Sequence, residues 1–201
     1  MVKVYMDIDS FVIFLFLFIL IAIVYYNVSY PMKYVEAYDG QKYLVIDDNL
    51  KNESANLLAL MNEKSSKLML RLKEKYGDDN ENLNRLFRNY KPNQLKEKHP
   101  KSLGTSFTLN KQDVILCLKK NNGKSMVDEN TLLFVLLHEI SHIMTKSIGH
   151  QEDYWENFRF LLAHAIVANL YEFDSYKNEK RYCGINISSS PIKLNEIENY
   201  I

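Results

Sequence analysis

Hydrophobic and polar residues are unevenly distributed along this chain, and the most apolar segment lies near its N-terminus. Residues 11–26, FVIFLFLFILIAIVYY, are all apolar or aromatic, and no charged residue occurs between Asp9 and Lys33. A helix needs about 20 apolar residues to cross the hydrocarbon core of a bilayer. We therefore expect residues 1–32 to form a membrane anchor that contacts the lipid bilayer through residues 10–32.

Two other interpretations of this segment stay open. A cleaved signal peptide begins with basic residues and ends at a small-residue cleavage site, whereas this N-terminus sets Lys3 against Asp7 and Asp9 and has no A-x-A pattern. A buried core helix would be apolar on every side at the extreme end of the chain. Lys33 and Lys42 give a small excess of positive charge after the segment. That excess weakly favours the cytoplasmic side for the following domain.

After the anchor, strand-like and helix-like periods alternate, which predicts an α+β domain over residues 33–201. The long helix, for example, places Leu57, Met61, Leu68 and Leu72 on one stripe. The expected elements are a strand at 42–47, a long helix from 47–49 to 75, a short helix at 82–90, a hairpin within 107–120 that turns at 110–112, and helices at 128–146 and 151–173. Residues 91–106 are expected to form a loop, and residues 182–194 an irregular tail.

Charge and cysteine content narrow the functional classes. The chain has 25 Lys and Arg residues and 25 Asp and Glu residues, so no overall field attracts nucleic acid, and direct nucleic-acid binding is not expected. Cys117 and Cys183 form neither a CxxC metal pair nor a disulfide framework. We expect them to indicate a reducing compartment, or to be two small buried side chains.

The helix expected at 128–146 contains the sequence HEISH. Residues four apart on a helix differ by about 40° around its axis, so His138 and His142 project from one face. Glu139 lies about 100° further round, within reach of a water on a metal held by the two histidines. Zinc peptidases use this division between ligands and a proton-accepting carboxylate. In so apolar a helix these polar side chains need partners, which a metal ion supplies.

His150 is the preferred third ligand. It follows Gly149, and a glycine permits a left-handed cap after which the chain returns its next side chain to the metal. The rival carboxylates are Glu152, Asp153 and Glu156 nearby, and Glu172 or Asp174 further on.

Structural, non-catalytic interpretations of the histidines remain open. His138 and His142 can be hydrogen-bonded core residues, or the site can hold a purely structural zinc ion. His164 lies on an apolar helix and is expected in the core or in support of the site, while His99 lies in a charged, solvated loop.

HEISH at 138–142 followed by GHQEDYWENFRFLL at 149–162 resembles the WLM family of zinc metallopeptidases, relatives of the SprT-like proteases. In that family HExxH is followed by a third histidine and then by an aromatic residue and a tryptophan, the place that Tyr154 and Trp155 occupy here. This sequence is especially similar to WLM-like metallopeptidases encoded by large DNA viruses. The segment YCGINISSSP at 182–191 also resembles those proteins.

The resemblance covers about residues 40–195, although its specific part is 136–162. It implies a minigluzincin-like domain, Zn2+ as the cofactor, Glu139 as the catalytic base and Trp155 packed behind the site, where it is equally compatible with plain core. The residues that match the family's zinc ligands are His138, His142 and His150. The spacing between the second and third histidines is longer here and a tyrosine replaces the usual phenylalanine, which puts the subfamily in doubt.

These residues predict a membrane-anchored metalloendopeptidase that acts on a protein or peptide. Zinc lowers the pKa of its water to about 7, and Glu139 takes a proton and passes it to the leaving amine. We hypothesise that the strand within 113–120 offers an edge for an extended substrate. No tyrosine or arginine is assigned to the oxyanion.

Two alternative functions remain. The first is a non-catalytic structural protein of a membrane or of a virion, located in the viral particle or its internal membrane, that retains a peptidase fold; the complete motif argues against it. The second, implied by the WLM and SprT resemblance, is proteolysis of DNA-bound proteins, against which the neutral charge and the anchor argue.

Overall fold

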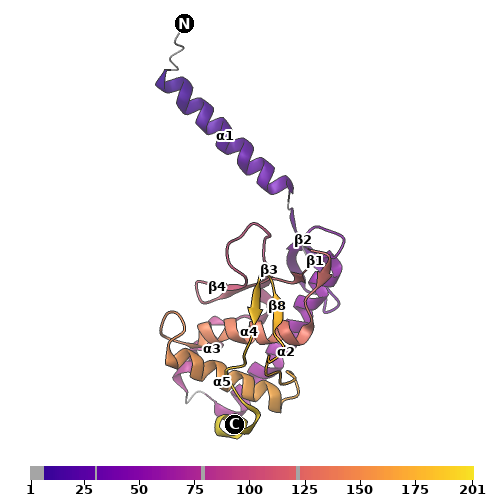
Figure 1. The fold of residues 1–201 in the computed structure, drawn as a ribbon, viewed down its shortest axis with the longest axis vertical. Coiled ribbons are helices and arrows are strands. Elements are labelled where there is room, and N and C mark those ends of the chain that lie inside the picture. Colours follow the sequence, from indigo (N-terminus) through magenta and orange to yellow (C-terminus); the bar gives the residue numbers. More distant parts are fainter. Residues whose placement is uncertain (1–6, 30, 78–79, 121–122) are drawn as a thin grey trace.

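The structure is a computed structural model that describes residues 7–29, 31–77, 80–120 and 123–201, and it confirms the predicted mixture of helices and strands. One long helix, α1 (Ile8–Ser29), extends away from a domain that holds the described strands, and the C-terminus lies at the opposite end of the molecule (Figure 1). Lys3, on which the expected orientation partly depends, lies outside the described residues.

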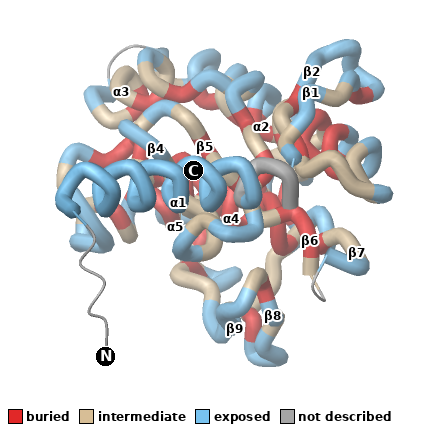
Figure 2. The backbone as a smooth tube through the Cα atoms, turned by 90° about the horizontal axis from the view of Figure 1, so that it is seen from above, coloured by how far each residue is buried: buried red, intermediate tan, exposed pale blue. Residues whose placement is uncertain are grey.

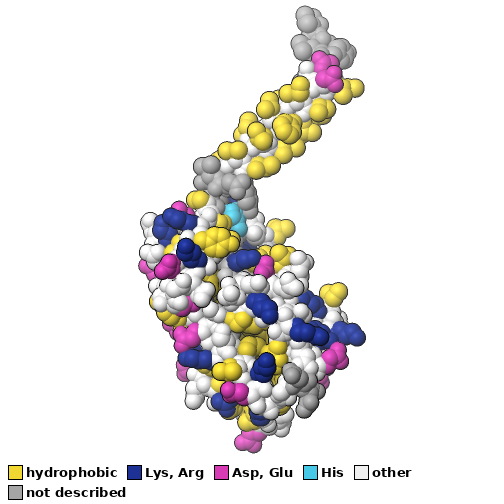
Figure 3. All heavy atoms as spheres, turned by 180° about the vertical axis from the view of Figure 1, so that it is seen from behind, with side chains coloured by type: hydrophobic (Ala, Val, Ile, Leu, Met, Phe, Trp, Pro, Cys, Tyr) yellow, Lys and Arg dark blue, Asp and Glu magenta, His cyan; other side chains and the backbone are white. Residues whose placement is uncertain are grey.

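Helix α1 has the length and composition of a membrane-spanning helix. Its apolar window Ile8–Tyr25 is 0% buried within the molecule, and apolar side chains cover the surface of the helix (Figure 3). A helix of 22 residues is about 33 Å long, close to the thickness of a hydrocarbon core. An N-terminal signal sequence meets the same criteria, so the helix alone does not decide between the two.

The main sheet has five strands in the order β1-β2-β3-β5-β4. The β1–β2 and β4–β5 pairs are antiparallel, whereas β3 pairs in parallel with both β2 and β5. The strands are β1 (Met32–Glu36), β2 (Lys42–Ile46), β3 (Leu95–Glu97), β4 (Phe107–Leu109) and β5 (Asp113–Leu116). Strand β1 was not expected, and β3 forms within the stretch that was expected to be a loop.

The hairpin expected within residues 107–120 is present as β4 and β5. Its turn contains Asn110 and Lys111, both at φ 53°, in the left-handed region that asparagine tolerates better than most residues. The hypothesis that the strand within 113–120 forms a free edge was wrong, because β5 lies between β3 and β4. The end strand is β4. A separate short pair, β6 (Lys119–Lys120) and β7 (Ser125–Met126), follows β5.

Helices pack beneath the sheet and form most of the core. The helices are α2 (Lys51–Tyr76), α3 (Glu81–Asn89), α4 (Glu129–Met144) and α5 (Glu152–Val167), with short 3-10 helices η1 (Pro92–Gln94) and η2 (Leu194–Tyr200). Helix α2 packs on β1, β2 and β3, and α4 packs on β4, β5 and α5. Figure 2 shows the buried backbone concentrated where these layers meet. Helix α5 ends earlier than expected, because Asn169 turns left-handed at φ 54°.

The C-terminal tail is more ordered than its sequence indicated. Residues expected to be irregular form most of a hairpin, β8 (Lys180–Tyr182) and β9 (Ile185–Ile187). The expectation that the cysteines form no disulfide was also wrong. Cys117, just after β5, is bonded to Cys183 in the turn of this hairpin, with 6.3 Å between their Cα atoms. A separation of 66 residues hides such a pair from local sequence patterns.

A buried ion pair connects β3 to β6. The ammonium of Lys119 lies 3.1 Å from Glu97 and 2.7 Å from Asp48, and the Glu97 carboxylate also accepts the backbone N–H of Ile46. The side chains of Lys119 and Glu97 are only 6% and 2% exposed. Burial raises the pKa of Glu97, and its bonds to Ile46 and Lys119 oppose that rise.

We predict that Lys119→Met lowers the free energy of unfolding by about 3 kcal/mol at neutral pH, because Glu97 is left as an unpaired buried charge. The loss should shrink as the pH falls through the raised pKa of Glu97 toward about 4.3, since protonation removes that charge. The measurement is urea unfolding in mild detergent, followed by the fluorescence of Trp155.

The matched control is Lys96→Met. Lys96 pairs with Asp113 at 2.8 Å, but their side chains are 32% and 29% exposed, so its loss should cost less than about 1 kcal/mol. Equal losses for the two variants would contradict the assigned role of the Lys119 pair.

Candidate metal centre

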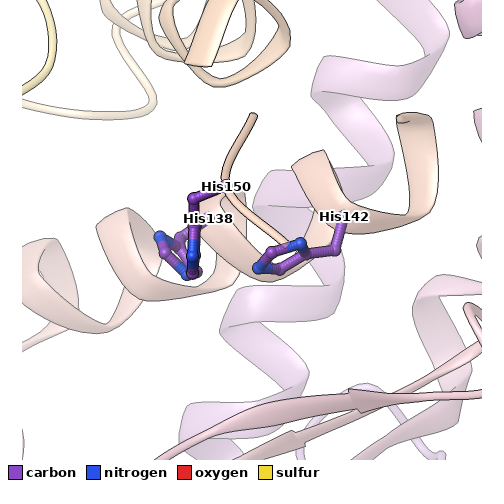
Figure 4. A group of neighbouring side chains, drawn as sticks. All are labelled: His138, His142 and His150. Atoms are coloured by element: carbon purple, nitrogen blue, oxygen red, sulfur yellow. The ribbon is translucent and has the colours of Figure 1, made fainter. Parts of the chain in front are cut away.

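Helix α4 carries two of the clustered histidines on a buried scaffold. Its N-cap is Asp128, whose carboxylate accepts the backbone N–H of Thr131. The apolar run after the cap packs the helix into the core. His138 and His142 lie one turn apart and project in the same direction, as expected from their spacing, and Figure 4 shows His150 meeting them from the segment that follows the helix.

The segment after α4 is held by side-chain donors. The helix ends at Met144, slightly before the expected residue 146. The ammonium of Lys111 donates to the carbonyl oxygens that follow, those of Thr145, Lys146 and Ser147. Gly149 is left-handed at φ 80°, as expected, although it lies within the loop instead of capping the helix. These constraints return His150 to the face of α4.

The three imidazoles lie close enough to share one metal ion. Their ligand nitrogens all lie within 4.8 Å of one another, and the Nε2 atoms of His150 and His138 are 3.2 Å apart. Burial, reinforced by the neighbouring histidines, lowers the pKa of His138 to about 3. Burial, together with His150 and Lys111, lowers that of His142 to about 4. Both rings are therefore neutral at physiological pH, the form in which imidazole binds a metal.

Glu139 lies beside the histidines but is held by a different element. Its carboxylate is buried, and Oε2 accepts a hydrogen bond of 2.9 Å from the Thr108 hydroxyl on β4. Burial raises the pKa of Glu139 to about 7, against the opposing effect of the Thr108 bond. The carboxyl is therefore poised to exchange a proton near neutral pH.

Aromatic rings from α5 support the cluster from behind. The ring of Tyr154 stacks on His142 with centroids 4.4 Å apart and meets His138 and His150 edge-on. Trp155 stacks on His150 at 5.6 Å, the position that the sequence suggested. The aromatic pair therefore orients the imidazoles, and Tyr154 is as central as the tryptophan.

The rival carboxylates are engaged elsewhere or lie outside the cluster. Among the described residues, the group around these histidines that can hold a metal contains no carboxylate. Glu152 pairs with Arg159, Asp153 accepts from Ser147, and Asp174 pairs with Lys180. Glu156 and Glu172 do not belong to the cluster.

The other two histidines are separate from the cluster. His164 is buried in the core, where its Nε2 lies 2.9 Å from the hydroxyl of Tyr76, and burial lowers its pKa to about 4. His99 lies in the loop after β3, where its Nδ1 accepts the backbone N–H of Lys101.

The cluster opens into a cleft of about 500 Å³. The walls come from the strand β4 and its flanks, from α4, from the loop before His150 and from the β8–β9 hairpin. Sequence reasoning missed Thr108, Lys111 and the hairpin residues, because their roles depend on long-range packing. Tyr154 was noted only as a neighbour of Trp155.

The donor set suits a tetrahedral ion. Nitrogen ligands bonded at about 2.0 Å to such an ion lie roughly 3.3 Å apart, close to the separation of His138 and His150. With three imidazoles as ligands, a tetrahedral ion would keep one coordination position for water or substrate, and Glu139 lines the same cleft as the histidines. The arrangement can therefore bind a metal ion and place a proton acceptor beside it.

Comparison with known proteins finds viral proteins that are named as uncharacterized. No protein-family model matches the sequence, and no solved structure matches it. The uncharacterized protein 136R of Invertebrate iridescent virus 6 is 39% identical over 80 residues, which are 39% of this chain and 44% of that protein. The uncharacterized protein 042R of Invertebrate iridescent virus 3 is 36% identical over 80 residues, 40% of this chain and 50% of that protein. The matches therefore span half or less of these two relatives.

A third relative matches over most of its length. The uncharacterized protein R325 of Acanthamoeba polyphaga mimivirus is 30% identical over 167 residues, which are 77% of this chain and 81% of that protein. All three relatives are viral proteins. At this identity and coverage, the chain belongs to the same protein family as R325 of Acanthamoeba polyphaga mimivirus.

Proposed function

We propose that this chain is a zinc metallopeptidase of the WLM-like group with a minigluzincin-like domain. The observation that carries the proposal is the convergence of three imidazoles, from His138, His142 and His150, beside the buried carboxylate of Glu139 in one open cleft. A core that merely satisfied its histidines would not need a cleft or a proton acceptor at this place.

In this proposal each residue has a defined task. His138, His142 and His150 would hold the zinc ion, which would supply a water of lowered pKa and a Lewis acid for the substrate carbonyl. Glu139 accepts a proton from that water and passes it to the leaving amine. Thr108 holds the Glu139 carboxylate by donating to Oε2, and Tyr154 and Trp155 keep the imidazoles in place.

Strand β4 supports a mode of substrate binding. It ends the five-stranded sheet and carries Thr108, which contacts Glu139. An extended peptide that pairs with the free side of β4 would run along the cleft, with its backbone held by hydrogen bonds to the strand. This assigns to β4 the role that the sequence suggested for the strand after it.

We further propose that α1 is a membrane anchor. An apolar helix that is 0% buried over Ile8–Tyr25 exposes more apolar surface than a monomer in water tolerates. A bilayer provides the missing apolar cover while the helix satisfies its own backbone hydrogen bonds.

We predict that the full chain, purified in detergent, contains about one zinc ion per chain and that His150→Ala loses most of it. Removal of one of three protein ligands leaves too few to hold the ion. The measurement is elemental analysis after metal reconstitution and dialysis, with His99→Ala as the control that should retain zinc.

Two results would contradict this assignment. Absence of zinc from the reconstituted wild type would reject the enzyme and favour a structural protein. Full zinc retention by His150→Ala would reject His150 as the third ligand and return attention to Glu152, Glu156 or Glu172.

We predict that Glu139→Gln lowers kcat by at least about 100-fold, because the proton acceptor is removed, while zinc content stays unchanged. The measurement is the cleavage of an unfolded protein substrate by the zinc-loaded chain, followed by mass spectrometry of the products. Glu74→Gln, the same change at an exposed position of α2, should cleave like the wild type. Undiminished cleavage by Glu139→Gln would eliminate Glu139 as the base.

We predict that the expressed chain remains in the membrane fraction after alkaline extraction and that deletion of residues 1–31 releases it. The apolar helix is the feature that holds it there. N-terminal sequencing of the membrane-bound protein supplies the decisive control, because a start after residue 29 would identify a cleaved signal sequence instead.

A further inference from the structure

The β8–β9 hairpin stands apart from the main sheet and lines the cleft. Its strands pair only with each other among the described strands, and in Figure 2 it projects from the domain as a separate lobe. The turn consists of Cys183 and Gly184, at φ 46° and 95°. Two successive left-handed residues match the twist of a tight two-residue hairpin. Glycine adopts this conformation freely, whereas Cys183 is an uncommon residue there.

Two links hold the tip of the hairpin against the end of β5. The first is the disulfide between Cys183 and Cys117. The second is the hydroxyl of Tyr182, a fully buried residue, which donates to the carbonyl oxygen of Cys117 at 2.9 Å and lies 2.6 Å from the hydroxyl of Ser106. Because Tyr182 uses its proton on Cys117, Ser106 donates to Tyr182. Ser106 in turn accepts the backbone N–H of Cys117.

The hairpin presents an apolar face to the cleft. Ile185 and Ile187 lie two apart on β9 and therefore share a face, while Asn186 between them bonds to Glu179. Both isoleucines line the cleft, and Ile185 is 48% exposed. Ile185 lines the same cleft as Glu139, so an apolar ligand group in the cleft can cover its exposed surface.

Helix α4 adds apolar residues to the lining of the cleft. Phe134 lies one turn before His138 on the same face of α4, and Val135 follows it. Both line the cleft together with the hairpin.

The charged side chain of Lys111 lies away from Phe134. Besides the histidines and Glu139, Lys111 is the charged residue among those that line the cleft, and its ammonium is bonded near Thr145. Thr145 is about 16 Å along the helix axis from Phe134, so the apolar end of the cleft is remote from this charge.

We propose that the β8–β9 hairpin is the wall of the cleft that selects an apolar substrate side chain, and that the Cys117–Cys183 disulfide positions it. This inference rests on the proposed function, because it takes the cleft to be a peptide-binding site. The substrate class is a polypeptide with a leucine-sized or phenylalanine-sized residue beside the cleaved bond, seated among Phe134, Ile185 and Ile187.

The test measures binding separately from cleavage. The full chain carrying Glu139→Gln is purified in detergent and loaded with zinc. Fluorescence anisotropy then gives its Kd for labelled alanine peptides that differ only in one central residue: leucine, phenylalanine, serine, aspartate or lysine. The leucine and phenylalanine peptides should bind at least about tenfold more tightly than the serine peptide.

Second-site variants locate the source of this preference. Ile185→Asp, added to the same chain, should abolish the preference for leucine and favour the lysine peptide. Leu70→Asp is the matched control, because Leu70 is a 60% exposed residue of α2 outside the cleft, and its preference should not change. The double variant Cys117→Ser and Cys183→Ser should reduce the leucine-to-serine ratio while zinc content stays unchanged, a result that general destabilisation would not produce.

Each outcome decides the inference. Equal Kd values for the leucine and serine peptides, no binding of any peptide, or an unchanged preference in Ile185→Asp would overturn the selecting wall. An unchanged ratio in the double serine variant would overturn the positioning role of the disulfide.

The proposed function is judged independently, by cleavage of the leucine peptide by the zinc-loaded chain with Glu139 intact. Leucine preference without cleavage would support the wall and reject the peptidase. Cleavage without a preference for leucine would support the peptidase and reject the selecting wall.

Discussion

The arrangement of the whole site depends on the burial of α4. This helix packs against the sheet and α5, and few of its residues reach solvent. Polar groups at such a position are costly unless each has a partner, so the placement of His138, Glu139 and His142 constrains everything around them. The strand β4 must bring Thr108 to the carboxylate, and α5 must bring Tyr154 to the imidazoles. The cleft gives solvent access to the cluster.

The third histidine is placed by a different kind of constraint. His150 is not on a regular element, and Ile148 in the loop before it is 88% exposed. The ammonium of Lys111, from the turn between β4 and β5, donates to the carbonyl oxygens of loop residues 145–147. Arg85 on α3 similarly donates to the carbonyl of Met144. Lys111 and Arg85, from distant segments, thus fix the backbone that leads to His150. The backbone of His138 and His142 is fixed instead by hydrogen bonds within α4.

The sequence predicts features that depend on local periodicity and fails where formation depends on distant partners. The four domain helices and the turn at Asn110 and Lys111 follow from spacing and composition, and so does the clustering of the three histidines. Strand β3 has only three residues and exists because β2 and β5 flank it, so no local pattern marks it. The disulfide joins positions that become neighbours only when β8–β9 folds back over the domain, and the same folding gives the cleft its apolar wall.

The disulfide also changes the covalent topology of the chain. Cys117 and Cys183 are the ends of a closed ring, and the ring contains α4, α5 and the loop between them, hence all three histidines and Glu139. Closing a loop of this length reduces the chain entropy of the unfolded state, an effect worth roughly 4 kcal/mol in the loop-closure description. The restriction applies to the segment that carries the histidine cluster and not to α2 or the N-terminal strands. Even in the unfolded protein, therefore, the three histidines stay tethered within one ring. The segment that contains them has fewer conformations to search during refolding than the same segment would have without the disulfide.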